Sequence, residues 1–398
     1  VTAAGRAAAI ENGLERFQAQ VAATARDPGV ATALGLLEGG FEQLRADPLL
    51  TPEQDAAVDS FYEEGLAAFF GEAGIDPPPI EDLVPESEVG RYLQYRWIVE
   101  NPFPTQERAE LDSVDDGTAY DAAHAATHPF LRELSDTLIG DLDSDLLLVS
   151  AATSDIVYSV DKRSDFATNL ATGPYSDTAL AEAVLERLSE AGVGEAVFVD
   201  YEPYLPAGGS PSLFLASAIT ADRELIGALV LEIPSEALTD TMTAGGRFEE
   251  LGLGQTGEAY VVGGDRLMRS DPRFFIEDPE GYLERFRAEG YAEESAELIE
   301  FSESTAFLQP VDTEPAEAAL DGEDFSGVTD NYLGFETLSS AVPVGAGDLD
   351  WVVVAEIRTE ETDNALNEYL ERILLIAAVL TPIVDVVAFL LSRGLTRS

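Results

Sequence analysis

Tyrosines and carboxylates gather in the segment VDYEPY, residues 199–204, at the end of a predicted strand. Asp200, Tyr201 and Tyr204 lie close together in this segment, and a glycine pair follows at residues 208–209. Aromatic faces beside carboxylates attract a cation, because the ring quadrupole and the negative charge act in the same direction. The segment therefore indicates a binding site for an amine or another cationic group. Ordinary strand and turn residues are the alternative interpretation.

His124 and His128 are the two histidines of the chain. They stand four residues apart in a predicted helix, which places them on one face. A zinc site of the HExxH type needs a glutamate base and a third ligand, whereas the run here reads HAATH. We predict a structural role for both, with pH sensing as the alternative. The chain has no cysteine, and we expect no metal and no cofactor.

Three further charged residues, Arg269, Asp271 and Arg273, stand close together in the second half of the chain. A local ion pair or turn cap is the favoured interpretation, and a second ligand site is the alternative. The glycine-rich run GLGQTG at 252–257 lacks the Lys-Ser/Thr of a phosphate loop. Two clustered histidines support no Ser-His-Asp arrangement, so we expect no enzymatic activity from this region.

The charge balance is extreme, with 76 acidic residues, 22 basic residues and a net charge of −54. Lys162 is the only lysine. Such a surface repels nucleic acid, whose binding depends on basic side chains. A folded chain tolerates this self-repulsion best at about 1 M salt, where the Debye length is ~3 Å. We expect a salt-adapted protein with no nucleic-acid partner.

Residues 373–392, ILLIAAVLTPIVDVVAFLLS, form an apolar stretch of the length that spans a bilayer of ~30 Å. The preceding residues are acidic, and Arg393 and Arg397 follow. The positive-inside tendency places residues 1–372 outside the cell and 393–398 in the cytoplasm. Pro382 and Asp385 weaken this interpretation, and a buried core helix is the alternative.

Hydrophobic periodicity divides the rest of the chain. Helical patterns fill most of the first 140 residues. Strand patterns then appear in two sets with a similar order, so the chain contains an internal repeat. The expected parts are a helical region (1–140), a distal module (141–245), a proximal module (246–358), a juxtamembrane helix (359–372), the membrane span (373–392) and a stub (393–398). In the proximal module, we expect a strand–turn–strand over 257–270 and one helix over 282–300.

Two segments, residues 157–180 and 252–274, carry a resemblance to the double Cache sensor domains of prokaryotic receptors. The second reads GLGQTGEAYVVGGDRLMRSDPRF and is very similar to a pattern of such receptors. The resemblance covers residues 3–398. It implies an α+β fold with long N-terminal helices, two PAS-like modules with antiparallel sheets and one C-terminal transmembrane helix.

The resemblance also implies a ligand site in the distal module, between the sheet and its covering loops. The implied residues are Tyr158, Asp165, Tyr175, Asp200, Tyr201, Tyr204 and Phe214.

The resulting hypothesis is a sensor that signals through the membrane to a cyclase, methyl-accepting or kinase output domain. Its partners would be a small amine or other cationic metabolite, the membrane and a second copy of the chain. The helix stripes 10–21 and 366–373 would pack across the dimer axis. A membrane-anchored binding or adhesion protein, or an anchored secreted hydrolase, is the alternative.

Overall fold

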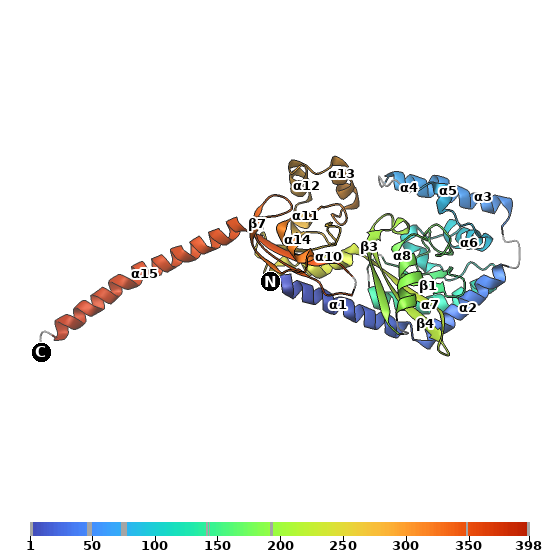
Figure 1. Ribbon diagram of the computed structural model, residues 1–398, viewed down its shortest axis with the longest axis horizontal. Helices are drawn as coiled ribbons and strands as arrows, with labels where there is room; N and C mark the ends of the chain where they lie inside the picture. The colour runs from blue at the N-terminus through green and yellow to red at the C-terminus, as the bar shows by residue number, and fades with distance from the viewer. Residues whose placement is uncertain are drawn as a thin grey trace.

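The computed structural model describes residues 3–395 except 46–49, 73–77, 141, 143, 192–193 and 348. The side chains of 69, 72, 249, 250, 365–369, 371 and 385–395 also lie outside the description. Two antiparallel sheets follow one another along the molecule, and a single long helix, α15, projects from the second (Figure 1).

The first sheet, which we call the distal sheet, has the strand order β2-β1-β5-β4-β3. Its strands are β1 (Leu146–Ser150), β2 (Ile156–Ser159), β3 (Ala196–Pro203), β4 (Pro211–Ala221) and β5 (Glu224–Pro234). The hairpin between β4 and β5 turns at Asp222 and Arg223, which both have positive φ. Two left-handed residues match the twist of a tight hairpin.

The second sheet, the proximal sheet, has the order β6-β9-β8-β7. Its strands are β6 (Glu258–Val262), β7 (Phe325–Asp330), β8 (Glu336–Pro343) and β9 (Val352–Arg358). Both sheets are antiparallel throughout their described pairings, as the α+β interpretation predicted.

Helices form the N-terminal part and cover both sheets. The N-terminal and distal α-helices are α1 (Ala3–Thr24), α2 (Pro28–Leu44), α3 (Pro52–Ser60), α4 (Ala67–Glu72), α5 (Ile80–Leu83), α6 (Glu88–Gln94), α7 (Ala119–Ile139), α8 (Ala179–Ala181) and α9 (Leu188–Glu190). The later ones are α10 (Ser235–Thr243), α11 (Arg273–Glu277), α12 (Pro279–Ala288), α13 (Glu293–Ser302), α14 (Glu314–Leu320) and α15 (Thr359–Leu395). Single turns of π-helix or 3-10 helix are η1 (Phe61–Leu66), η2 (Tyr95–Val99), η3 (Thr105–Glu110), η4 (Glu182–Arg187), η5 (Leu205–Ala207) and η6 (Phe248–Leu251).

Side-chain caps explain several helix starts. The Asp27 carboxylate accepts a hydrogen bond from the Gly29 amide at the start of α2, and Pro28 takes the first helical position. Thr118 caps α7 through the amide of Asp121. Ser87 does the same for α6 through Gly90. In each case an Asp, Ser or Thr stands immediately before the first helical residue, which is the usual position of a capping side chain.

Two details of the proximal module differ from the sequence expectation. Residues 282–300 form parts of two helices, α12 and α13, separated by a turn at Gly290, whose φ is +89°. Only glycine adopts such a conformation readily, so one continuous helix was a wrong prediction. Residues 257–270 supply one strand, β6, and a single bridge between Val262 and Met268 in place of a second strand.

Helix α1 lies along both sheets, and one hydrophobic core includes residues from it and from each sheet (Figure 1). Ile10 and Val21 are buried in this core, and Leu14 and Phe17 pack against it. The predicted dimer stripe of α1 is therefore covered by the chain's own sheets, which corrects the expectation that it faces a second copy. Amphipathic spacing indicates a buried face but does not identify the surface that buries it.

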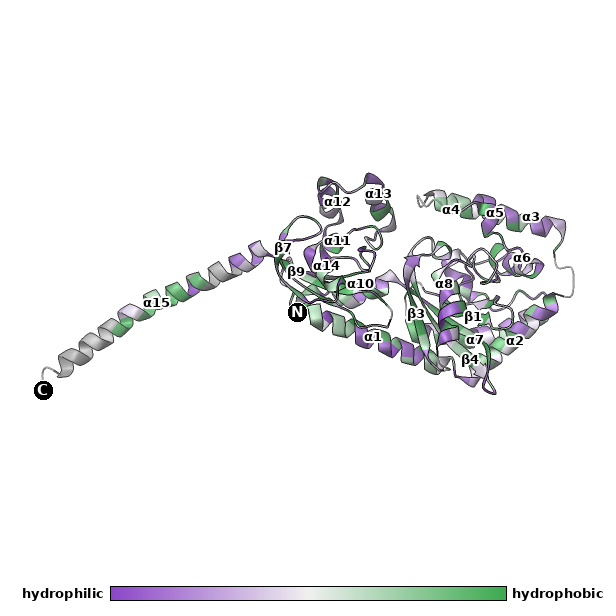
Figure 2. Ribbon diagram, viewed as in Figure 1, coloured by the Kyte–Doolittle hydropathy of each residue, from purple (hydrophilic) through white to green (hydrophobic). Residues whose placement is uncertain are grey.

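Helix α15 leaves the proximal sheet directly after β9 and extends away from both modules (Figure 1). Apolar residues occupy the middle of this helix (Figure 2). Among the described residues, no helix meets the length and hydropathy needed to cross a bilayer. Of the predicted span 373–392, the structure describes side chains only as far as residue 384.

Gly227 of β5 occupies a site with no room for a side chain. A Cβ there would lie 2.4 Å from the Val149 carbonyl oxygen and 2.5 Å from Leu34 Cδ2. We expect Gly227→Ala to lower the free energy of unfolding by about 1–3 kcal/mol, as overpacking does. Gly13→Ala in α1 is the matched control, since its Cβ meets nothing within 4 Å. Equal denaturation midpoints for the two variants would contradict this packing.

Candidate functional site

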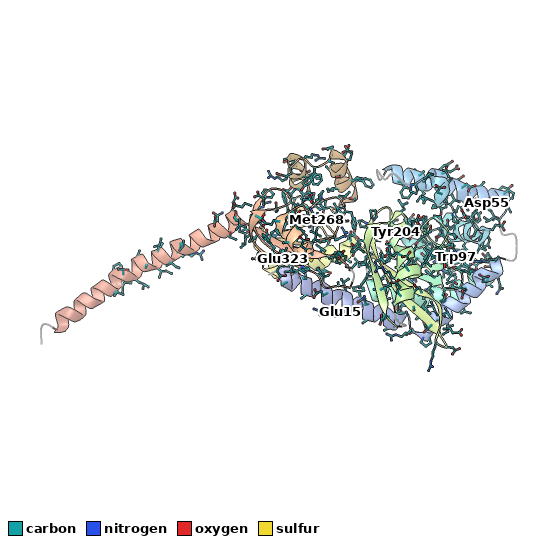
Figure 3. The ribbon with its side chains drawn as sticks, in the orientation of Figure 1. Glu15, Asp55, Trp97, Tyr204, Met268 and Glu323 are labelled. Carbon is teal, nitrogen blue, oxygen red and sulfur yellow. The ribbon has the colours of Figure 1, made fainter. Side chains whose placement is uncertain are left out.

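Four of the predicted site residues meet on one side of the distal sheet. The Tyr204 hydroxyl donates a hydrogen bond of 2.8 Å to Asp165 Oδ2. The Tyr204 ring lies 4.9 Å from the Phe214 ring and 6.1 Å from the Tyr175 ring, centroid to centroid. We call Asp165, Tyr175, Tyr204 and Phe214 the distal cluster. Figure 3 labels Tyr204 beside the distal sheet.

Asp165 is the unusual member of the distal cluster. Its side chain is buried, and its Oδ1 atom has no hydrogen-bond partner. Burial raises the pKa of Asp165 to about 7, with the negative charge of Asp145 as the next cause and the Tyr204 hydrogen bond opposing both. An unpaired oxygen on a buried carboxyl is costly unless something else pairs with it. The cluster therefore has an open acceptor for a donor or cation.

A cavity of about 450 Å³ lies next to the distal cluster. Ser164 lines this cavity and bonds the Tyr175 hydroxyl at 2.8 Å, so the cluster lies directly behind the wall. The loop that follows Tyr204 forms another part of the wall and contains Gly208, whose φ is +70°. The remaining lining residues are Phe61, Gly65, Leu66, Thr105, Gln106, Arg108, Asp161, Arg163, Leu205, Pro206 and Ala207.

Two arginines of this cavity were missed by sequence reasoning. Arg163 forms a nearly buried pair with Glu232, with its Nη1 2.9 and 3.0 Å from the two carboxylate oxygens. Arg108 donates to the Lys162 carbonyl oxygen at 3.2 Å, and burial lowers its pKa. Basic residues are few in this chain, so each arginine is a candidate for a specific role. This low number of basic residues is the feature of the sequence that could have pointed to Arg108 and Arg163.

Asp200 and Tyr201 lie at the contact between the two modules, apart from the distal cluster. Asp200 accepts a hydrogen bond of 2.8 Å from the Trp351 indole and pairs with Arg269 at 3.1 Å. The Tyr201 ring stacks on Trp351 at a centroid distance of 5.8 Å. These contacts join β3 of the distal sheet to the proximal module. The prediction that all seven residues surround one ligand site is therefore not supported by the geometry.

Arg269, Asp271 and Arg273 of the proximal module do not form one site, because each has different partners. Arg269 pairs with Asp265, as a local ion pair, and with Asp200 of the distal sheet. Asp271 instead accepts hydrogen bonds from the amide of Thr305 at 2.6 Å and from its hydroxyl at 2.8 Å. Arg273 donates to the Gly254 carbonyl oxygen at 2.8 Å.

Tyr158 lies on the helix-covered face of the distal sheet, with the two histidines. Its hydroxyl donates to His128 Nδ1 at 2.6 Å, because His128 Nε2 must carry the proton that bonds the Ala109 carbonyl oxygen at 2.7 Å. Burial, assisted by the charge of Lys162, lowers the pKa of His128 to about 3 and that of His124 well below 6.5. Both histidines are neutral near pH 7, which supports the structural interpretation over pH sensing.

Lys162 is buried among aromatic rings next to these histidines. Its Nζ lies 4.5 Å from the Tyr158 ring centroid, 5.5 Å from that of Phe166 and 5.7 Å from that of Trp97. Burial lowers the pKa of Lys162 to about 7. The chain's own amino group thus occupies this aromatic cage, so Tyr158 faces the Lys162 side chain and not the cavity.

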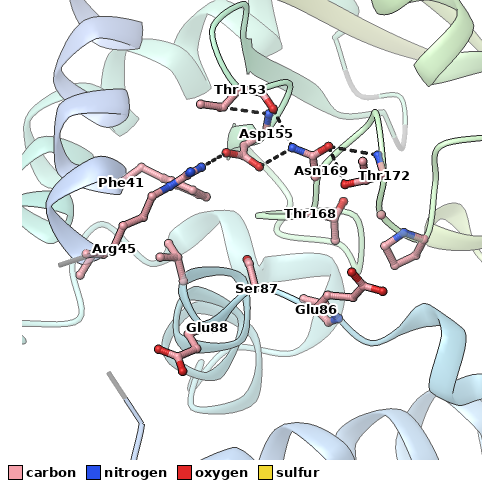
Figure 4. Close-up of a pocket in the computed structure, with 15 residues that line it drawn as sticks. Phe41, Arg45, Glu86, Ser87, Glu88, Thr153, Asp155, Thr168, Asn169 and Thr172 are labelled. Atoms are coloured by element: carbon pink, nitrogen blue, oxygen red, sulfur yellow. Dashed lines mark hydrogen bonds and ion pairs between the residues drawn. The ribbon is translucent and has the colours of Figure 1, made fainter. Parts of the chain in front are cut away.

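Another cavity of about 490 Å³ lies between α2, the start of α6 and the loop after β2 (Figure 4). Arg45 pairs here with Asp155, which also accepts a hydrogen bond of 2.8 Å from Asn169. The Asn169 side-chain oxygen accepts from the amides of Ala171 and Thr172. These charged and amide groups are already paired with one another, so this cavity is a weaker candidate than the one beside Asp165.

No model of a known protein family matches the chain, and no curated protein matches it. Solved structures do resemble it. The ligand-binding domain of the Pseudomonas fluorescens chemoreceptor CtaA, solved with L-serine, has 11% identity and a TM-score of 0.33, over 64% of this chain and 85% of that one. The corresponding domain of PctB from Pseudomonas aeruginosa PAO1, solved with L-Arg, has 13% identity and a TM-score of 0.32, over 55% and 72%.

The extracellular domain of a proposed histidine kinase, mmHK1S-Z3, has 14% identity and a TM-score of 0.32, over 60% of this chain and 79% of that one. All three TM-scores are below 0.5, so these likenesses carry no argument about function. These solved structures are ligand-binding domains of chemoreceptors and the extracellular domain of a proposed histidine kinase.

Proposed function

We propose that this chain is the extracellular sensing region of a double Cache receptor and binds a small amine at the distal cavity. The observation that carries the proposal is Asp165, a buried carboxyl with an unpaired oxygen behind the wall of a cavity of about 450 Å³. An ammonium ion would pair with Oδ1 and would face the rings of Tyr175 and Tyr204. Arg108, on the same cavity, suits a negative group at the other end of the ligand.

The ligand reaches Asp165 by moving the loop 205–209, which separates the cavity from Tyr204. Gly208 and Gly209 both have positive φ, with values of +70° and +79°. Such a loop changes conformation when a ligand binds one state better than the other. The same movement would pull on Tyr204 and on β3, whose Asp200 and Tyr201 contact the proximal module.

The route to the membrane is part of the proposal. Strand β9 continues into α15, and exposed apolar side chains follow along this helix. They include Leu370, Ile373, Leu374, Leu375, Ile376, Val379, Leu380, Ile383 and Val384. Apolar residues on all sides of a projecting helix support a membrane span at 373–392. Through this helix the receptor would dimerise and reach an output domain.

A thermal-shift screen of primary amines and amino acids in concentrated salt tests the proposal. A ligand that binds only the folded state raises the unfolding temperature. We expect at least one primary amine to raise it in the unmodified chain, and Asp165→Asn to abolish the shift. The exposed Asp177→Asn is the control, since it keeps the shift. A screen without any amine-dependent shift would reject amine sensing at this site.

A further inference from the structure

A separate cavity of about 170 Å³ lies in the proximal module, beside the start of α15. Glu258 and Glu356, cross-strand partners on β6 and β9, stand in its wall and are 5% and 6% exposed. The other lining residues are Gln255, Thr256, Arg273, Phe274, Glu277, Asn331, Phe335, Thr337 and Arg358. The cavity shares none of the lining residues of the distal one.

The two glutamates are held in place by hydrogen bonds. Glu258 accepts from the Tyr332 hydroxyl at 2.8 Å. Glu356 accepts from Asn331 Nδ2 at 2.6 Å and from the Tyr260 hydroxyl at 3.2 Å. Burial raises the pKa of both glutamates, and the charge of Glu258 raises that of Glu356 further. Burial and mutual repulsion disfavour two negative charges side by side, so the pair holds a proton more readily than either carboxyl would in water.

Arg358 supplies the opposite charge. Its guanidinium lies 3.7 Å from the Phe335 ring centroid and 5.2 Å from that of Phe274, which fixes the plane of the side chain. The other arginine of the wall, Arg273, is paired with Glu277 at 2.9 Å. Among the residues that the structure describes, no carboxylate lies within ion-pair distance of Arg358. Its N–H groups are therefore available to an anion.

We propose that this cavity is a second ligand site, which takes a short carboxylate with an amine or hydroxyl donor at its other end. The carboxylate would bind the planar guanidinium of Arg358, which suits two parallel hydrogen bonds. The donor would bind the Glu258–Glu356 pair. A cavity of about 170 Å³ is the smaller of the two candidate sites and suits a ligand of a few heavy atoms, such as glycine or glycolate.

An occupant of this site would touch the root of α15. Arg358 immediately precedes the helix, and its amide donates to the Thr256 hydroxyl at 3.2 Å. Glu361 in the first turn accepts from the amides of Gln255 and Thr256 at 2.8 and 2.7 Å. Gln255 and Thr256 also line the cavity. Only this coupling to α15 rests on the proposed sensor function; binding at the site does not.

Isothermal titration of the full chain with glycine, glycolate, acetate and ethylamine tests the site. We expect glycine, glycolate or both to bind, with acetate and ethylamine at least about tenfold weaker, because each lacks one of the two matched groups. Arg358→Gln should weaken binding about tenfold to a hundredfold. Arg358→Lys keeps the positive charge and the aliphatic part of the side chain but loses the planar guanidinium, so it should weaken binding about tenfold. This variant also provides a second test in case the glutamine variant misfolds.

Two controls separate this site from others. Arg266→Gln changes an exposed arginine of the same module and should leave binding unchanged. Asp165→Asn should also leave it unchanged, so failure of the distal proposal would not affect this result. Absence of binding by all four probes would overturn the proposal. An acetate affinity equal to that of the tighter of glycine and glycolate would overturn the role of the glutamate pair, and full affinity in both Arg358 variants would overturn the role of Arg358.

Discussion

Asp165→Asn is expected to flatten the pH dependence of stability. The pKa of Asp165 is about 7 in the folded chain, against about 3.9 in an unfolded one. The folded state therefore holds the proton more tightly, so this group's contribution to stability is complete below pH 4 and is lost as the pH rises to 7. Between pH 4 and 8, the variant should gain up to about 4 kcal/mol relative to the unmodified chain.

Denaturant unfolding in concentrated salt at pH 4, 5, 6, 7 and 8 measures this difference. The comparison between variant and unmodified chain is informative because other buried acids, such as Glu356 and Asp271, also have raised pKa values and contribute equally to both. Asp177→Asn, an exposed change in the same loop, should show no such trend. If the difference in unfolding free energy between the variant and the unmodified chain stayed constant from pH 4 to 8, the pKa of Asp165 would not be raised. The carboxyl would then have a partner or contact with water.

Trp351→Ala is expected to cost about 3–5 kcal/mol of unfolding free energy, the range for a buried tryptophan. Trp351 is 2% exposed, stacks on Tyr201 and donates its indole hydrogen to Asp200. Its removal would open the contact between the two modules and leave Arg269 as the partner of Asp200 from the proximal module.

Chemical denaturation followed by circular dichroism measures this loss. Trp351→Phe is the matched variant, because it keeps a ring against Tyr201 and removes the hydrogen bond, at a cost of about 1–2 kcal/mol plus the lost volume. A cost below about 1 kcal/mol for Trp351→Ala would show that the residue does not join the modules.

The sequence predicted the arrangement of elements well because the signals were local. Hydrophobic periodicity indicated helices in the first 140 residues and two sets of strands after them, and the structure has both. The surface that buries an amphipathic helix face is not a local property, because it is formed by residues far away in the sequence. Ile10 and Val21 gave a clear helical stripe, but only the tertiary structure shows that two sheets of the same chain cover it.

The candidate site was harder to predict, because a β-bulge changes which residues share a face. Val199 and Tyr201, two positions apart, would lie on the same side of a regular strand. The register of β3 shifts between Val199 and Glu202, and the two residues enter different cores. Tyr201 therefore leaves the face of Val199 and joins the core that α1 covers, whereas Tyr204, beyond the end of β3, packs with Phe214. Arg108 was missed for a different reason, since it lies in the short turn η3 with no periodic pattern around it.

The most direct measurement is the affinity of the best amine from the screen, by isothermal titration at pH 6, 7 and 8. An ammonium ion binds the ionised form of Asp165, so affinity should rise about tenfold per pH unit below the pKa and level off above it. Asp165→Asn should bind weakly at every pH. An affinity that is independent of pH, or undiminished in Asp165→Asn, would contradict the assignment of the distal cavity as the sensing site.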